Sequence, residues 1–370
     1  MVEANSTHEL TEDEAALYDR QIRLWGVESQ KRLRAANVLL IGLKGLGAEV
    51  CKNIVLAGVK SVTLLDNEPL AEEDFGTQFL AARVDIGKNR AESSVTRLRR
   101  LNPMVEIKVA SPEVGDAESD PSYRPDNFYS EFQVVIATGL GMTSLKRLNS
   151  VCRRASTEKN KICFFAGDVF GFHGFLFSDL QEHTHVEKTQ SVIPGKIKSG
   201  APSTITVTSS TTKCFVPIDE PFSLTWNSGN LVNVHDSIFL VQVLLTFRDE
   251  NGRSPSILKK DLDFEKLSKI RDQVLSNIGA PLDKVSDSAL KKSFGEACPV
   301  CAIMGGFLAQ EVVKAVSQMD APFNNFLLFE PDVCEGVVYR VAKDTVHGTF
   351  KRSKKKDQSP SCSPAKKMKV

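Results

Sequence analysis

Short apolar runs separated by glycine or polar residues mark the first half of the chain. Residues 38–41 form a continuous apolar run, as expected of a strand buried on both faces of a parallel sheet. Gly42, Gly45 and Gly47 follow, and a helical pattern begins near Gly47 before a second strand pattern at residues 62–65. This order predicts one strand-turn-helix-strand unit of a parallel sheet.

Further apolar runs begin near Ile107, Val134 and Ile162, in alternation with helical patterns. The alternation predicts an α/β fold with a doubly wound, mainly parallel sheet. Residues 162–180 are dense in aromatic residues and glycine. We expect His173 in this stretch to be packed or hydrogen-bonded, because no motif places an acid or a nucleophile with it.

The second half of the chain begins with a polar stretch, and helical patterns follow it. Residues 186–213 have the Ser, Thr, Lys, Gly and Pro composition of a linker or mobile loop. Residues 235–297 predict helices, and residues 299–317 predict a last helix that returns to the first domain. The expected units are an α/β domain of residues 10–178 and 298–347, a mainly helical insertion of residues 179–297, and a disordered basic tail of residues 348–370.

Composition is that of a globular protein able to bury a large core, since 41% of the residues are hydrophobic and 25% are charged. No uninterrupted apolar run approaches a membrane span, and the N-terminus is acidic and polar. We therefore expect neither secretion nor a membrane partner. The eight cysteines are scattered, as expected of reduced thiols in the cytosol or nucleus.

The last twenty residues hold eight of the 47 basic residues and one of the 46 acidic ones. Two basic clusters flank a Ser/Pro spacer that contains Ser359 and Ser363, which are candidate phosphorylation sites. We expect a bipartite nuclear localisation signal that an import receptor reads as an extended strand, and hence a nuclear protein with a cytoplasmic pool. The signal comprises Lys351, Arg352, Lys354, Lys355, Lys356, Lys366, Lys367 and Lys369. Nonspecific nucleic-acid binding and a purely solvating tail are the alternatives.

The glycine turn is a candidate nucleotide site. Its glycines let backbone N–H groups approach a phosphate, and Asp66 ends the next strand where an acid can accept bonds from a ribose. Glycines also serve plain strand-to-helix turns, so the turn alone is a weak signal. A dinucleotide-dependent oxidoreductase would use the same features, but the sequence shows no hydride-transfer site.

Two further segments flank this turn. Residues 18–26 (YDRQIRLWG) precede it, and residues 299–314 (PVCAIMGGFLAQEVVK) lie near the end of the chain. In this order they resemble the adenylating enzymes that activate ubiquitin-like proteins, whose ThiF/MoeB relatives act on bacterial sulfur-carrier proteins. The length of 370 residues is closest to the smaller, noncatalytic subunits of heterodimeric SUMO-activating enzymes. The resemblance covers residues 12–345 and implies a Rossmann-like adenylation fold, whose insertion is the noncatalytic half of the cysteine-domain layer.

The chain departs from the family pattern where the phosphates and magnesium of a competent site would bind. Phe75, Gly76 and Thr77 stand where the family has an Asn and an Arg, and the acids at residues 72–74 disfavour ATP. Arg90 replaces a family lysine, and Thr138 and the residues after it provide no carboxylate for magnesium. We therefore expect an inactive site with no metal, in which Gly42, Gly45, Gly47 and Asp66 are a degenerate remnant.

Arg20, in the DRQ segment, matches the family's arginine that reaches into the partner's nucleotide pocket. The resemblance therefore implies a catalytic role for Arg20 in trans, on the partner's ATP. The alternative is that Arg20 and Arg23 are ordinary surface charges on an amphipathic helix that buries Ile22, Leu24 and Trp25.

Two cysteine sites also need weighing. Cys298 and Cys301 have the spacing of zinc ligands, but no second pair accompanies them, so packing is the favoured interpretation. Cys214 lies in a short strand pattern with only Lys213 to activate a thiolate. The resemblance assigns the thioester-forming cysteine to the larger partner.

The resemblance implies a regulatory subunit in an obligate heterodimer. Its larger catalytic partner would hold ATP and magnesium and bind SUMO, and a SUMO-conjugating enzyme would receive the product. This chain would bind no cofactor and no specific nucleic acid. A self-sufficient homodimeric adenylating enzyme would share the fold, but the lost phosphate and magnesium ligands oppose it.

Overall fold

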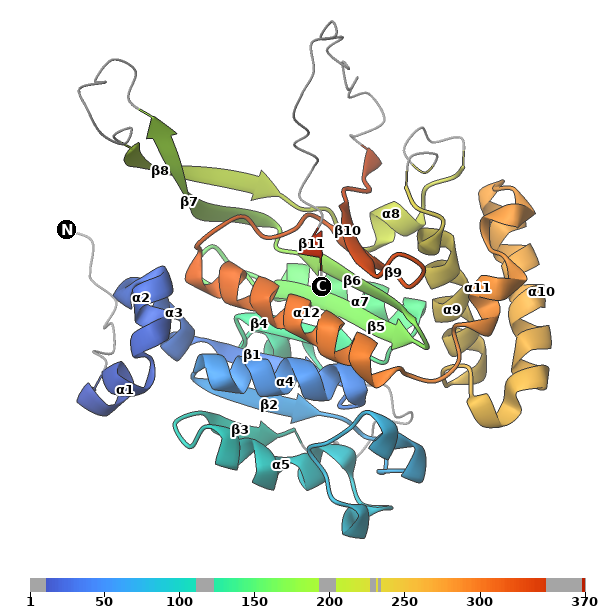
Figure 1. Cartoon of the computed structure of the whole chain (residues 1–370), viewed down its shortest axis with the longest axis horizontal. Coiled ribbons are helices and arrows are strands. Elements are labelled where there is room, and N and C mark those ends of the chain that lie inside the picture. Colours follow the sequence, from blue (N-terminus) through green and yellow to red (C-terminus); the bar gives the residue numbers. More distant parts are fainter. Residues whose placement is uncertain are drawn as a thin grey trace, which may run out of the picture.

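The computed structural model describes residues 11–110, 123–192, 204–226, 231, 234–343 and 368–369. In this part of the chain a nine-stranded sheet runs through the molecule, with helices on both of its faces (Figure 1). In their order across the sheet, the strands are β11 (Met368–Lys369), β10 (Glu335–Tyr339), β9 (Phe326–Glu330), β6 (His173–Asp179), β5 (Cys163–Phe170), β4 (Val134–Thr138), β1 (Asn37–Ile41), β2 (Ser61–Leu65) and β3 (Glu106–Val109).

Five neighbouring strands, from β5 to β3, are parallel. Val38 of β1 lies opposite Val62 of β2 and Val134 of β4, so the predicted apolar runs pair with one another. All residues of β2 and β4 are buried, because helices cover both faces of this part of the sheet. The prediction of a doubly wound, mainly parallel α/β sheet is confirmed.

The other half of the sheet is antiparallel. β6 turns back on β5 through Gly171, and the two strands pair from Phe164 opposite Asp179 to Phe170 opposite His173. The aromatic stretch predicted near Ile162 is therefore a buried hairpin. β9, from the end of the chain, then pairs with β6. The C-terminal part of the chain therefore completes the sheet that the N-terminal part begins.

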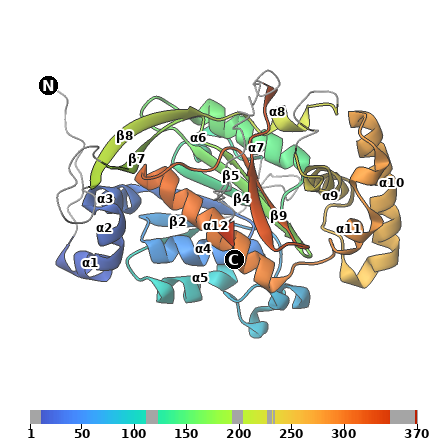
Figure 2. The same cartoon turned by 45° about the horizontal axis from the view of Figure 1, so that its top comes forward.

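The helices form a layer on each face of the sheet (Figures 1 and 2). Ile54 of α4, Leu98 of α5 and Leu308 of α12 share one buried core with the sheet, and Leu148 of α7 and Phe239 of α9 share the other. The helices are α1 (Glu12–Leu17), α2 (Asp19–Trp25), α3 (Val27–Ala35), α4 (Gly45–Ala57), α5 (Arg90–Leu101), α6 (Asp126–Tyr129), α7 (Met142–Ala155), α8 (Asp219–Phe222), α9 (Ser237–Asn251), α10 (Lys260–Ile278), α11 (Asp287–Lys291) and α12 (Cys298–Ser317).

The predicted helices after residue 235 are present as α9, α10 and α11. Leu267 of α10 and Leu290 of α11 belong to the same core cluster as Phe326 of β9. α9 contacts β9 of the sheet, α10 packs against α9, and α11 packs against α10. The domain boundaries proposed from the sequence stay a prediction.

The prediction of a loop over residues 186–213 is wrong for the described part of this stretch. β7 (Glu182–Val192) and β8 (Thr204–Cys214) form an antiparallel hairpin that projects from the body of the molecule (Figure 1). Polar residues dominate both strands, so the sequence offered no clear apolar alternation to reveal them. A two-stranded ribbon outside the core does not require such an alternation.

By length and composition, α12 is apolar enough to cross a membrane, although Gln310, Glu311 and Lys314 interrupt its apolar run. Most of its apolar stretch is buried against the rest of the protein, as in a core helix.

The predicted disordered tail lies outside the described residues, apart from Met368 and Lys369. These two residues form β11, paired with Gly336 and Glu335 of β10, which the sequence did not predict. The other predicted localisation residues, Lys351, Arg352, Lys354, Lys355, Lys356, Lys366 and Lys367, lie outside the described part of the chain.

Candidate functional site

The glycine turn between β1 and α4 is tightly packed. Gly42 has a φ of +82°, and a Cβ there would lie 2.2 Å from the carbonyl oxygen of Thr138. A Cβ at Gly47 would lie 2.0 Å from the carbonyl oxygen of Gly42. Both positions therefore require glycine. α4 begins at Gly45, two residues before the predicted start.

The backbone N–H at the start of α4 is bonded to a side chain of the same protein. The N–H of Gly45 donates to Oε2 of Glu296, at 3.0 Å, and the hydroxyl of Thr77 donates to the same oxygen, at 2.9 Å. Burial and the negative charge of Asp168 raise the pKa of Glu296, although Thr77 and Lys44 act in the opposite direction. The place where a phosphate would approach the turn thus holds a carboxyl group.

Asp66, predicted as the remnant of a ribose-binding acid, is fully engaged within the protein. Its carboxylate accepts the N–H of Leu43 at 2.7 Å and the N–H of Glu68 at 3.0 Å. Nη1 of Arg90 lies 2.9 Å from one carboxylate oxygen and 2.8 Å from the other. Both side chains of this pair are almost completely buried. Asp66 therefore has little capacity left for a ribose.

Arg90 also bonds Asp74, one of the acids that the sequence placed near a triphosphate. Nε of Arg90 lies 3.1 Å from Oδ2 of Asp74, which is buried as well. Burial disfavours the guanidinium charge, but the carboxylates of Asp66 and Asp74 outweigh it and raise the pKa of Arg90. Arg90 thus neutralises two buried acids, whereas the family lysine at this position is expected to meet phosphate.

The start of α7 is also capped from within the chain. Asp249 of α9 accepts the N–H of Thr143 at 3.1 Å and its hydroxyl at 2.9 Å. Thr138, where the family's magnesium-binding aspartate is expected, donates its hydroxyl to the carbonyls of Ile41 and Gly42. Among the described residues, no group of three or more His, Cys, Asp or Glu side chains is arranged to hold a metal ion.

A buried ion pair lies behind Glu296. Asp168 of β5 pairs with Arg248 of α9, and Arg248 also donates to the carbonyl of Leu140, at 3.1 Å. The pair ties α9 to the edge of the sheet at which the glycine turn lies.

Sequence reasoning missed Glu296, Asp249, Asp168 and Arg248 as parts of this site. The bond from Gly45 to Glu296 spans 251 residues. Single carboxylates outside any motif gave no local signal of such a contact.

Arg20 lies away from this site, on the exposed surface of α2. Arg23 pairs with Asp19 at 3.0 Å, while the described residues show no partner for Arg20. The amphipathic alternative is wrong for Leu24, which is 73% exposed, and Leu17 is also more than half exposed. Arg20 therefore stands beside uncovered apolar side chains.

The remaining candidate residues lie apart from the turn or are inert. Cys298 is exposed and Cys301 is buried, and burial raises the pKa of the Cys301 thiol. Cys214 is exposed at the end of β8. His173 is buried, as predicted, and burial together with Lys292 lowers its pKa to about 4.

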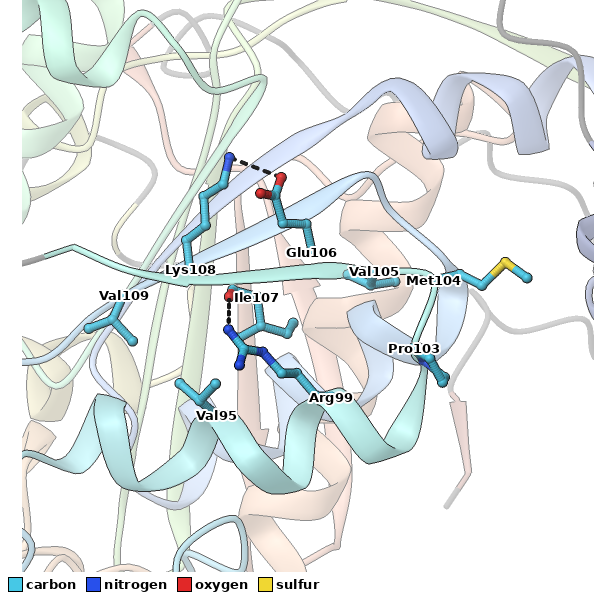
Figure 3. Close-up of a pocket in the computed structure, with 9 residues that line it drawn as sticks. All are labelled: Val95, Arg99, Pro103, Met104, Val105, Glu106, Ile107, Lys108 and Val109. Atoms are coloured by element: carbon cyan, nitrogen blue, oxygen red, sulfur yellow. Dashed lines mark hydrogen bonds and ion pairs between the residues drawn. The ribbon is translucent and has the colours of Figure 1, made fainter.

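A hollow of about 940 Å³ lies at the edge strand β3, away from the glycine turn (Figure 3). Arg99 of α5 reaches across its floor and donates to the carbonyl of Ile107, at 3.3 Å. Lys108 and Glu106 pair above the strand. Charged side chains thus line this hollow, and Arg99 bonds one carbonyl of the edge strand β3.

The sequence of the chain is similar to those of known proteins. Residues 18–363 match the ThiF family. The chain belongs to the ThiF family. It is similar to proteins named SUMO-activating enzyme subunit 1: it is 42% identical to the Homo sapiens protein over 342 residues, which cover 89% of this chain and 95% of the relative. The Xenopus laevis relative is 40% identical over 342 residues (89% and 96%), and the Danio rerio relative is 40% identical over 345 residues (89% and 95%).

Among solved structures, this ThiF family member is similar to a crystal structure of PaaA, with a TM-score of 0.50 and 13% sequence identity. The match covers 92% of this chain and 78% of that one. At this identity the likeness concerns the fold alone. The expected Rossmann-like adenylation fold is confirmed by the family match together with the observed sheet.

Proposed function

We propose that the chain is the regulatory, noncatalytic subunit of a heterodimeric SUMO-activating enzyme. Within the assembly, the larger subunit binds ATP and magnesium, adenylates the C-terminal glycine of SUMO and takes it onto its own cysteine as a thioester. A conjugating enzyme then receives SUMO. The 42% identity to a relative named SUMO-activating enzyme subunit 1 supports the choice of SUMO.

One observation carries the noncatalytic assignment. The carboxylate of Asp66 is occupied by Arg90 and by two backbone N–H groups, in a buried network that leaves little place for a ribose. The carboxyl group of Glu296 accepts a hydrogen bond from the N–H of Gly45, at the start of α4. A self-sufficient homodimeric enzyme would need these groups for its own nucleotide, so this observation disfavours that alternative.

The N-terminal helices supply the surface that the proposal assigns to the larger subunit. Leu17, Leu24 and Val27 are all exposed, and they surround α2, which carries Arg20. Several exposed apolar side chains within a short segment are typical of a protein interface. A guanidinium presented from such an interface can reach polyphosphate on the partner, which supports the role of Arg20 in trans.

The basic tail belongs to the proposal as a nuclear import signal read by an import receptor, with a cytoplasmic pool remaining. Its support is the sequence, in which Lys351 and the basic residues after it form two clusters around a Ser/Pro spacer.

Pyrophosphate exchange into ATP tests the assignment, because it reports adenylate formation alone. The purified full-length chain, given SUMO, ATP and magnesium, should show no exchange above background. Exchange should appear when the larger subunit is added. Exchange by the isolated chain at catalytic stoichiometry would overturn the proposal, and the larger subunit alone is the control for the contribution of this chain.

A further inference from the structure

The contact between Glu296 and the glycine turn has the form of a bound anion. α4 is 13 residues long, and its first N–H, from Gly45, points at Oε2 of Glu296. The N-terminus of a helix attracts negative charge, because its N–H groups are unpaired and its dipole is positive at this end. The hydroxyl of Thr77 provides a second donor to the same oxygen.

The carboxyl group also fills the space in front of the turn. A Cβ built on Gly45 would lie 2.7 Å from Oε2 of Glu296 and 2.4 Å from Cβ of Thr77. The turn is therefore closely packed around Gly45. Because the N–H of Gly45 already donates to Oε2 of Glu296 at 3.0 Å, a phosphate must displace that oxygen before it can bond Gly45.

Negative charge near the glycine turn also opposes the binding of a phosphate. Asp168 lies close enough to Glu296 to raise its pKa, and Asp66 and Asp74 are buried beside the same turn. Arg248 and Arg90 are each already paired with one or more of these carboxylates. These two arginines are therefore engaged within the protein, and Lys44, just before α4, is the other cation whose charge acts on Glu296.

We propose that Glu296 is a built-in anion that takes the phosphate position of the glycine turn, holds the start of α4 in place without nucleotide, and excludes nucleotide phosphates. The carboxyl group comes from the segment just before α12, so residues near the end of the chain close a site that the N-terminal half forms. This inference concerns the turn alone and does not depend on SUMO or on the larger subunit.

Pyrophosphate without metal is the direct probe, titrated calorimetrically into the full-length chain. Glu296→Ala removes the internal anion and should bind pyrophosphate at least about tenfold more tightly than the unmodified chain. Its midpoint of thermal unfolding should rise with pyrophosphate concentration, while that of the unmodified chain should not.

Glu73→Ala is the matched control, since Glu73 is an exposed acid near the same turn and its loss changes the net charge equally. The inference is wrong if Glu73→Ala gains as much affinity as Glu296→Ala, if neither gains any, or if the unmodified chain binds as tightly as Glu296→Ala.

If Glu296→Ala does not fold, Glu296→Gln replaces it, because the amide oxygen can still accept from Gly45 and Thr77. Glu296→Gln should then bind pyrophosphate more tightly than Glu73→Ala, with slower hydrogen exchange at the Gly45 amide in the presence of pyrophosphate. Equal affinity of Glu296→Gln and Glu73→Ala would contradict the inference.

Discussion

At the scale of single residues, the charges in this protein that would handle nucleotide in an active relative are paired with one another. Arg90 lies between Asp66 and Asp74, and all three are buried. A buried pair is costly to break, because removing one partner leaves an uncompensated charge in the interior. Arg20 is different, because the described residues leave it exposed and unpaired.

Arg20→Ala should leave the heterodimer intact and slow adenylate formation, because the guanidinium is proposed to stabilise charge on the partner's ATP. Loss of one charged contact should cost about 2–4 kcal/mol in the transition state. Single-turnover formation of the SUMO adenylate measures the rate, and size-exclusion chromatography checks assembly.

Arg23→Ala is the control for that experiment, because Arg23 pairs with Asp19 on the same helix and is equally a surface charge. Its adenylation rate should stay close to that of the unmodified enzyme. If Arg20→Ala assembles and forms the adenylate at the unmodified rate, the role of Arg20 in trans is wrong.

The pH dependence of stability tests the environment of Glu296. Because burial and Asp168 raise its pKa above 4.5, the folded chain holds this proton more tightly than the unfolded chain. The stability that protonation contributes is complete below the unfolded pKa and is lost as the pH rises through the folded pKa. The free energy of unfolding of the unmodified chain should therefore fall relative to that of Glu296→Gln as the pH is raised from 4.5.

Urea unfolding over a pH series measures this difference, and Glu73→Gln controls for loss of one acid on the surface. Parallel pH profiles for the unmodified chain and Glu296→Gln would show that the pKa of Glu296 is not raised.

The sequence predicted only part of the site. Gly42 and Gly45 could be located because a strand, a turn and a helix follow one another locally. The lack of a carboxylate in residues 138–141, at the end of β4, was equally a local observation. Glu296 and Asp249 could not be located, because their partners are far away in sequence and a single carboxylate has no spacing to recognise.

At the scale of elements, α4 and α12 cross at very short range on one face of the sheet (Figure 1). A Cβ at Gly305 of α12 would lie 2.4 Å from Cβ of Glu49 on α4. A Cβ at the neighbouring Gly306 would meet nothing within 4 Å. Two adjacent glycines of one helix thus have opposite environments.

Gly305→Ala should lower the free energy of unfolding by about 1–3 kcal/mol, because the added methyl group forces the two helices apart. Gly306→Ala should raise it by about 0.5–1 kcal/mol, because alanine favours the helix and the site is open. Urea unfolding of both variants measures the contrast. Equal effects of the two substitutions would show that the helices do not cross at Gly305.

The strands with runs of apolar residues were predicted from the sequence, whereas the polar hairpin of β7 and β8 was not. β1, β2 and β4 are buried on both faces and therefore appear as apolar runs. β7 and β8 pair over eleven residues each with mainly polar side chains. Their pairing includes backbone hydrogen bonds and a hydrogen bond between the hydroxyls of Thr184 and Thr212, and neither requires an apolar alternation in the sequence.

At the scale of the whole molecule, charge is divided between the folded body and the tail. The last twenty residues are strongly basic, so the rest of the chain carries a net negative charge. An import receptor recognises individual lysine side chains in a groove, whereas a polyelectrolyte contact follows the total charge and weakens steeply with salt.

Changing Lys355, Lys356, Lys366 and Lys367 to Ala should move the full-length protein towards the cytoplasm, even when basic residues are restored elsewhere in the tail. Fluorescence microscopy of a tagged chain measures the distribution. Truncation after His347 should abolish accumulation in the nucleus and leave SUMO activation in vitro essentially unchanged. If the truncated chain reaches the nucleus as well as the full chain does when its partner is absent, the signal lies elsewhere.

The hollow beside β3 bears on how readily a further strand could add to this edge of the sheet. An exposed edge strand is a template with which the strand of a second molecule can pair, and β3 is a short edge of four residues. At β3 the guanidinium of Arg99 donates a hydrogen bond to the carbonyl of Ile107. The ion pair of Lys108 and Glu106 places charged groups beside the same edge. Three side chains therefore make this edge a poorer template for a tenth strand, whether that strand comes from another protein or from a second copy of this one.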